Sequence, residues 1–157
     1  KTADWKTYRN EEYGFEVRYP NYSIVKTSQD KKGSLVIYFN SQSSSTLACW
    51  EYAHSKPNSD VGVLCNYENF KISIRNTPSS LEESLPSNIT DINYYGPLKK
   101  NIISGEPAYE FIAHGMIDYY TALVKHHNNL YEFFFAIENS ELSLTQKQFI
   151  STFKFTK

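Results

Sequence analysis

Short segments in which apolar and polar residues alternate recur along the whole sequence. A period of two places apolar side chains on one face of a β-strand and polar side chains on the other. In residues 15–19 (FEVRY), Phe15, Val17 and Tyr19 are expected to point inward. The alternation in residues 70–75 (FKISIR) predicts a second such strand. Further strands are predicted in segments 4–9, 34–39, 99–104, 106–115, 118–127 and 129–137.

Turn signals separate these segments. Residues 10–14 (NEEYG) predict a turn that ends at a glycine, and residues 30–33 (DKKG) predict another. Pro20 ends the strand before it, because proline has no N–H to give to a ladder. His127-Asn128-Asn129 indicates a tight turn, because asparagine tolerates the positive φ that such turns require. The second half of the chain is therefore predicted to be an antiparallel meander.

Two segments favour helices. Segment 80–86 begins with a serine followed by Glu82 and Glu83, and acidic residues are favourable at the positive end of a helix dipole. Leucines four residues apart form one face of this short helix, and Pro86 ends it. Near the end of the chain, apolar residues recur at roughly helical spacing: Leu142, Phe149, Ile150 and Phe153. The combined pattern predicts an α+β fold, an antiparallel β-sheet flanked by helices.

Length, composition and charge narrow the class of protein. A chain of 157 residues is expected to form one domain. Its 16 basic and 17 acidic residues give a net charge of -1, which argues against non-specific nucleic-acid binding. The sequence starts at Lys1 without methionine and has no apolar run of membrane length. We expect a processed chain in which a removed signal or a lipid-anchored linker precedes Lys1, so that any membrane attachment is through that anchor.

Residues 40–68 read as an insertion that contains both cysteines of the chain, Cys49 and Cys65. A disulfide between them would stabilise the insertion by about 3 kcal/mol through loop entropy. Two free buried thiols are an alternative. A zinc site with His54 is a third, because cysteine and histidine are good zinc ligands, but the spacing supplies no fourth ligand. The disulfide is the favoured prediction, and no metal site is predicted.

Histidines supply the only candidates for catalysis. His126 and His127 are adjacent, and adjacent strand residues point to opposite faces, so we expect polar residues beside a turn and not a chelating pair. His114 follows Glu110 by four residues, which separates them by about 13 Å along a strand. A direct acid–base pair is therefore not expected. The sequence contains no Gly-x-Ser-x-Gly, HExxH, phosphate loop or dinucleotide fingerprint.

Aromatic side chains give more support to a binding role. Paired tyrosines occur near predicted strand ends, and two more aromatic residues occur in the insertion; exposed rings of this kind suit contact with sugars, peptides or proteins. The alternative is that half of each pair packs in the core, because neighbours alternate between faces. The candidate binding residues are Trp50, Tyr52, Tyr94, Tyr95, Tyr119 and Tyr120.

Four segments, in order, resemble motifs of the PsbP-like family. YGFEVRYP resembles the first-hairpin segment of that family, and SGEPAYEF is similar to its Gly-Lys-x-Tyr-x-Phe strand. HNNLYEFFFAI resembles its polar turn and Leu-Tyr strand, and FISTFKF resembles its closing helix end. The resemblance implies an α/β/α sandwich around one antiparallel sheet. It also implies a location outside the cytoplasm, behind a signal or lipid anchor, as in small bacterial cell-surface lipoproteins.

The sequence thus predicts one PsbP-like domain over residues 1–157, with a disulfide-stapled insertion at about 40–68. We expect an extracytoplasmic, non-catalytic binding or assembly module without a cofactor, whose partner is a protein or cell-envelope component. The alternative is a metal-dependent or hydrolytic enzyme that uses His114, His126 and a nearby carboxylate. A third reading is an intracellular partner-binding domain of the same fold, which free thiols at Cys49 and Cys65 would favour.

Overall fold

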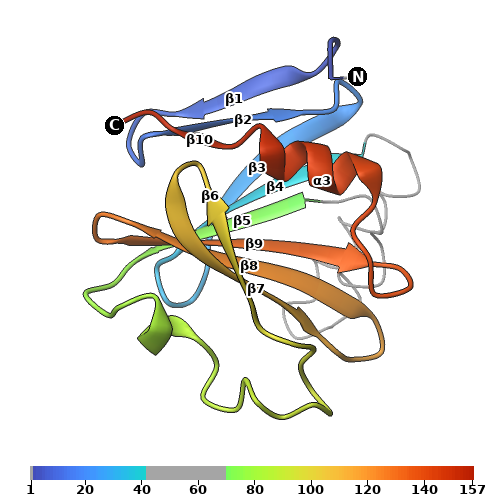
Figure 1. Ribbon diagram of the computed structural model, residues 1–157. Coiled ribbons are helices and arrows are strands. Elements are labelled where there is room, and N and C mark those ends of the chain that lie inside the picture. Colours follow the sequence, from blue (N-terminus) through green and yellow to red (C-terminus); the bar gives the residue numbers. More distant parts are fainter. Residues whose placement is uncertain (1, 42–69) are drawn as a thin grey trace.

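A computed structural model of the chain describes residues 2–41 and 70–157. The predicted disulfide between Cys49 and Cys65 lies outside the described residues, as do the candidate binding residues Trp50 and Tyr52. The described chain forms two antiparallel sheets and one α-helix (Figure 1). None of the helices in this part of the chain has the length and apolar character needed to cross a membrane.

The larger sheet has seven strands, and all its neighbouring pairs are antiparallel. In spatial order they are β3 (Ser23–Gln29), β4 (Leu35–Ser41), β5 (Phe70–Asn76), β9 (Asn129–Ile137), β8 (Asp118–His126), β7 (Glu106–Ala113) and β6 (Lys99–Ile103). The predicted meander of the second half is confirmed. The predicted turn after β8 is also present, and the residue with positive φ in it is His127, at 53°.

A smaller sheet lies across one face of the larger one, beside the helix (Figure 1). It consists of β1 (Lys6–Asn10), β2 (Phe15–Tyr19) and the two-residue β10 (Lys154–Phe155), with β2 in the centre. The alternation predicted for β2 is confirmed, because Phe15 and Val17 are both fully buried. Gly14 precedes β2 with φ 65°, a backbone conformation that favours glycine at this turn.

Helix α3 (Leu144–Ser151) begins with a capping box. The Ser143 side chain accepts a hydrogen bond from the Gln146 backbone N–H, and the Gln146 side chain accepts one from the Ser143 backbone N–H. The helix buries Phe149, whose ring stacks on Phe70 of β5 with the centroids 4.4 Å apart. These contacts fix α3 over the middle of the large sheet.

The main core lies between the large sheet and the layer formed by α3 and the small sheet, and it is rich in aromatic rings. Its largest fully buried side chains are Phe15, Phe39, Phe70, Tyr131, Phe133, Phe135 and Phe149. A second cluster lies on the other face of the sheet, around Phe111, Leu123 and Leu130. The segment 77–98 covers it through Leu81 and the partly buried Leu85.

The predicted α/β/α sandwich is wrong for the described chain. One face of the large sheet carries α3 together with the small β-sheet, and the other carries the irregular segment 77–98. The only helical part of that segment is η1 (Glu82–Ser84), one turn of 3₁₀-helix. The described architecture is therefore mostly antiparallel β-structure, with a single α-helix on one face.

Proline explains why the helix predicted at 80–86 stops after one turn. Its start signal is present, because the Ser80 N–H donates to Glu83 Oε2 (2.8 Å) and the Glu83 N–H donates to Ser80 Oγ (3.1 Å). Leu85, however, directly precedes Pro86, and a residue before proline is forced away from helical backbone angles. Leu85 is extended, with ψ 150°.

Strand β3 was not predicted. The turn after Pro20, closed by the Ser23 N–H donating to the Pro20 carbonyl (3.0 Å), separates the small sheet from the large one. The chain then enters β3, whose later residues are polar and exposed because the strand lies at the edge of the sheet. Edge strands bury less apolar surface, so the periodic signal is weak here.

Candidate functional site

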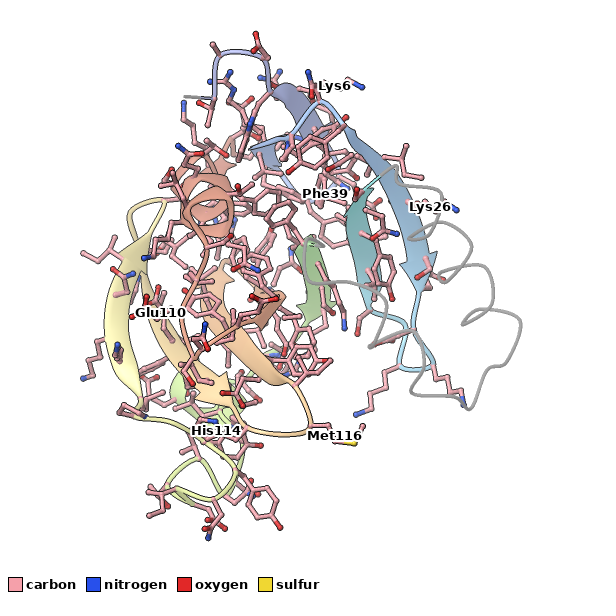
Figure 2. The ribbon with its side chains drawn as sticks, turned by 90° about the vertical axis from the view of Figure 1, so that its right-hand side faces the viewer. Lys6, Lys26, Phe39, Glu110, His114 and Met116 are labelled. Carbon is pink, nitrogen blue, oxygen red and sulfur yellow. The ribbon has the colours of Figure 1, made fainter. Side chains whose placement is uncertain are left out.

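A groove runs between α3 and the β6–β7 hairpin, on the same face of the sheet as the main core. Two cavities of about 620 and 300 Å³ lie along it and share Glu110, Tyr120, Leu142 and Lys147 in their linings. We call this the Glu110 groove, after the residue at its centre. Glu110 lies between the β6 strand and the α3 helix (Figure 2).

The floor of the Glu110 groove is a hydrogen-bonded set of three side chains from three strands. Glu110 Oε1 accepts from the Tyr120 hydroxyl (2.6 Å) and from Asn101 Nδ2 (2.7 Å). Burial and the neighbouring Glu110 carboxylate both raise the pKa of Tyr120, so its hydroxyl stays protonated and continues to donate. The set therefore holds the carboxylate in one position.

The walls are largely apolar, and the rim carries three lysines and Glu141. Ile103, Ile150 and Phe153 line the larger cavity, and Lys147 and Lys154 border it. Lys99 lines the smaller cavity together with Lys147. In residues 2–41 and 70–157, neither Lys99 nor Lys147 forms an ion pair with an acidic side chain. A groove of this kind can hold an amphipathic ligand and attract negative charge at its edge.

His114 lies outside the groove, in a hydrogen-bonded chain with Asp118 and Ser140. Its Nδ1 is 3.1 Å from Asp118 Oδ1, and Ser140 Oγ donates to Asp118 Oδ2 (2.9 Å). The aspartate thus separates the serine from the histidine, and no serine–histidine hydrogen bond activates a nucleophile here. Burial raises the pKa of Asp118, but the His114 and Ser140 hydrogen bonds outweigh it and hold that pKa below its usual value.

The lowered pKa of Asp118 predicts a loss of stability in acid. A carboxyl group whose pKa is lower in the folded state stabilises that state at pH values above its ordinary pKa of about 3.9. The stabilisation disappears as the pH falls through the lower folded pKa. We therefore expect Asp118→Asn to reduce the free energy of unfolding near neutral pH, with the difference from wild type shrinking below about pH 4.

Urea titrations at a series of pH values measure this difference. The matched control is Asp4→Asn, because Asp4 is exposed. A difference for Asp118→Asn that stays constant from neutral to strongly acidic pH would show that its carboxylate is not stabilised by His114 and Ser140.

His126 is at the opposite end of β8. Its Nδ1 is 2.8 Å from Glu106 Oε1, its Nε2 is 2.7 Å from the Lys157 carbonyl oxygen, and its ring stacks on Phe155. Nine-residue β8 separates Asp118 from His126 by about 26 Å at the usual rise per residue. The two histidines therefore do not converge on one site.

The rings of His126 and His127 lie closer than the sequence predicted. Their centroids are 4.1 Å apart, because His127 is in the turn with positive φ and does not continue the strand alternation. Both nitrogens of His126 already have protein partners. Within the described ranges, no three or more His, Cys, Asp or Glu side chains are grouped so that they could hold a metal ion.

The four described tyrosines proposed for binding are not brought together on one surface. Tyr94 is 57% exposed, whereas Tyr95 packs edge-on against Phe111. Tyr119 stacks on Phe134 with 4.4 Å between the centroids. Tyr120 alone lies in the Glu110 groove, where its ring is buried.

Sequence reasoning considered Glu110 only as a partner of His114 and missed the rest of the groove. One signal was available for Glu110: it shares a strand face with Ala108 and Ile112, so a carboxylate interrupts an apolar stripe. No comparable signal marks Asn101 or Lys147, because their position depends on which strands and helix become neighbours.

The sheet and its covering layer resemble the fold of a PsbP-like protein of known structure. That structure is the solution structure of the cyanobacterial PsbP protein CyanoP from Synechocystis, with a TM-score of 0.58 and 14% identity. That match covers 98% of this chain and 93% of CyanoP. A crystal structure from Bacteroides thetaiotaomicron matches with a TM-score of 0.52, also at 14% identity.

This second match covers 98% of the present chain but only 49% of the Bacteroides chain. No protein-family model matches the sequence, and no curated protein matches it significantly. At 14% identity the structural likeness shows the fold alone.

Proposed function

We propose that this protein is a non-catalytic, extracytoplasmic binding or assembly module that holds a protein or cell-envelope component in the Glu110 groove. The observation that carries this proposal is the composition of the groove. It has apolar walls and a central carboxylate that Tyr120 and Asn101 already bind, and no histidine lies in its described lining. Such a surface suits recognition better than proton transfer.

The enzyme alternative has less support. It uses His114, His126 and a nearby carboxylate, but each histidine has its own carboxylate at a different end of β8. The Ser140 hydroxyl donates to Asp118 and is not bonded to the imidazole. The geometry therefore offers no assembled acid, base and nucleophile in this part of the chain.

The location outside the cytoplasm is supported by the sequence resemblance to the PsbP-like family, whose members usually occur there.

Site-specific photocrosslinking tests the proposal. A photoreactive benzoylphenylalanine replaces Ser151, an exposed residue at the groove rim, and in the matched control it replaces Ile92, which is 84% exposed on segment 77–98. Each variant is irradiated with an envelope extract of cells that produce the protein. We expect a discrete adduct from position 151 only.

Competition shows whether the adduct depends on the groove. Excess unlabelled wild-type protein should abolish the adduct, whereas excess Lys147→Glu protein should compete at least tenfold less well. Lys147 is exposed on α3, so this change is compatible with the fold. Equal adducts from positions 151 and 92, or equal competition by both proteins, would contradict a binding site in the groove.

A further inference from the structure

Strand β6 forms one edge of the large sheet and borders the Glu110 groove. Among the strands that the structure describes, β6 pairs only with β7. Residues 99–102 are exposed, and Ile102 is 69% exposed. An exposed edge presents backbone N–H and C=O groups to which another strand can bond. β6 is therefore a pairing surface placed directly beside the candidate site.

The hydrogen bonds of Asn101 show which backbone groups face the free edge. The Ile102 N–H donates to Asn101 Oδ1 (2.8 Å), while Asn101 Nδ2 donates to Glu110 Oε1 (2.7 Å). Backbone groups of successive strand residues alternate between the two sides, so Lys100 presents its N–H and C=O to the same free edge as Ile102. Asn101 Oδ1 thus accepts the Ile102 N–H in the place that a partner strand's carbonyl would take. Through its Nδ2, the same side chain also bonds to Glu110 on the groove floor.

Three lysines lie beside this edge. Lys99 and Lys100 are on β6, and Lys147 of α3 lines the smaller cavity together with Lys99 and the acidic Glu141. The Lys100 ammonium lies 6.0 Å from the ring centre of Tyr109, and Lys99 and Lys147 have no ion-pair partner among the described side chains. The acidic Glu110 between them is already engaged by two donors. An incoming strand with carboxylates would complement this rim.

We propose that β6 takes up an extended acidic segment of a partner protein as an additional strand. Alternate carboxylates of that segment would face Lys99 and Lys147 on the groove side, and apolar side chains between them would contact Ile102 on the other side. This inference rests on the proposed function, because it names the class of partner that the groove binds. A second copy of this chain fits less well, since pairing two β6 edges brings lysine-bearing strands together.

A designed peptide tests strand addition directly. The probe is a fluorescein-labelled Glu-Val-Glu-Val-Glu-Val-Glu peptide, and its affinity for the full chain is measured by fluorescence polarisation. The first control is the same peptide with lysine in place of glutamate. The second is the glutamate peptide with alternate backbone nitrogens methylated, which keeps the charges but cannot form a ladder. We expect both controls to bind at least tenfold more weakly.

Protein variants locate the binding. Lys99→Glu/Lys147→Glu should weaken binding of the acidic peptide at least tenfold and should strengthen binding of the lysine peptide. Ile102→Pro should also weaken binding, because it removes the outward N–H that the incoming strand would take over from Asn101 Oδ1, at an edge position where proline is tolerated. Ile102→Thr is its matched control and should bind within about twofold of wild type. In wild-type protein, the peptide should slow amide hydrogen exchange at Lys100 and Ile102.

Results that differ from these expectations overturn the proposal. Equal binding of the methylated peptide would exclude ladder formation, and equal binding of the lysine peptide would exclude charge recognition. Self-association that Ile102→Pro abolishes would assign the edge to a second copy. If the peptide does not bind while the competable adduct at position 151 persists, the acidic-strand proposal fails and the proposed function stands. If that adduct is also absent, both fail.

Discussion

Replacing Phe149 with alanine is expected to lower the free energy of unfolding by about 3–5 kcal/mol. The Phe149 ring is fully buried, stacks on Phe70 at 4.4 Å and meets the edges of Phe39 and Phe135. The change removes the ring that fixes α3 to the large sheet and leaves a cavity that the surrounding rings cannot fill without moving. Because α3 also forms one wall of the Glu110 groove, we expect binding there to weaken with it.

Leu144 provides the matched control on the same helix. It is 71% exposed, so Leu144→Ala should change the free energy of unfolding by less than about 0.5 kcal/mol. Guanidinium titrations of both variants, monitored by circular dichroism, give the comparison. Similar losses for the two variants would show that α3 does not bury Phe149 in the sheet core.

Gln146→Ala is expected to lower the free energy of unfolding by about 2–3 kcal/mol, although the residue is polar. Gln146 is 3% exposed, and its side chain makes two hydrogen bonds. Its Oε1 accepts from the Ser143 N–H (2.9 Å), and its Nε2 donates to the Ala136 carbonyl at the end of β9 (2.7 Å). The substitution leaves a buried backbone acceptor without this donor and removes half of the capping box.

Gln148→Ala is the control for this prediction, because it makes the same change on the same helix. Gln148 is only partly buried, and we expect the free energy of unfolding to change by less than about 0.5 kcal/mol. Chemical denaturation measures both variants. If Gln146→Ala were as mild as Gln148→Ala, the link between α3 and β9 would not contribute to stability.

Local alternation was enough to predict most of the sheet. Strand β2 and strand β9 begin and end where the sequence predicted: β2 alternates with a period of two, and β9 is rich in aromatic residues and follows a turn signal. The short helix predicted at 80–86 is present as a single 3₁₀ turn, η1, because Leu85 before Pro86 is extended. Strand β3 was missed because an edge strand needs little apolar periodicity.

The candidate site was much harder to predict than the strands. Its central residues, Asn101, Glu110, Tyr120 and Lys147, come from β6, β7, β8 and α3. Alternation assigns each strand residue to a face but does not say which strands become neighbours. The tyrosine pairs suggested a binding surface made of exposed rings. In the structure, however, the ring of Tyr119 stacks on Phe134 and that of Tyr95 packs edge-on against Phe111. The groove depends on which strands and helix become neighbours in the fold, whereas the sequence pattern indicates only the local structure of each segment.

The small sheet pairs Phe155 of β10 with Phe15 of β2, which joins early and late parts of the described chain. During synthesis, the layer formed by α3 and the small sheet therefore cannot be completed until Phe155 has left the ribosome. Contacts between residues so distant in sequence also slow the search for the native state in solution. Until this pairing forms, part of the apolar face of the large sheet stays uncovered, and exposed apolar surface of this kind is prone to aggregation.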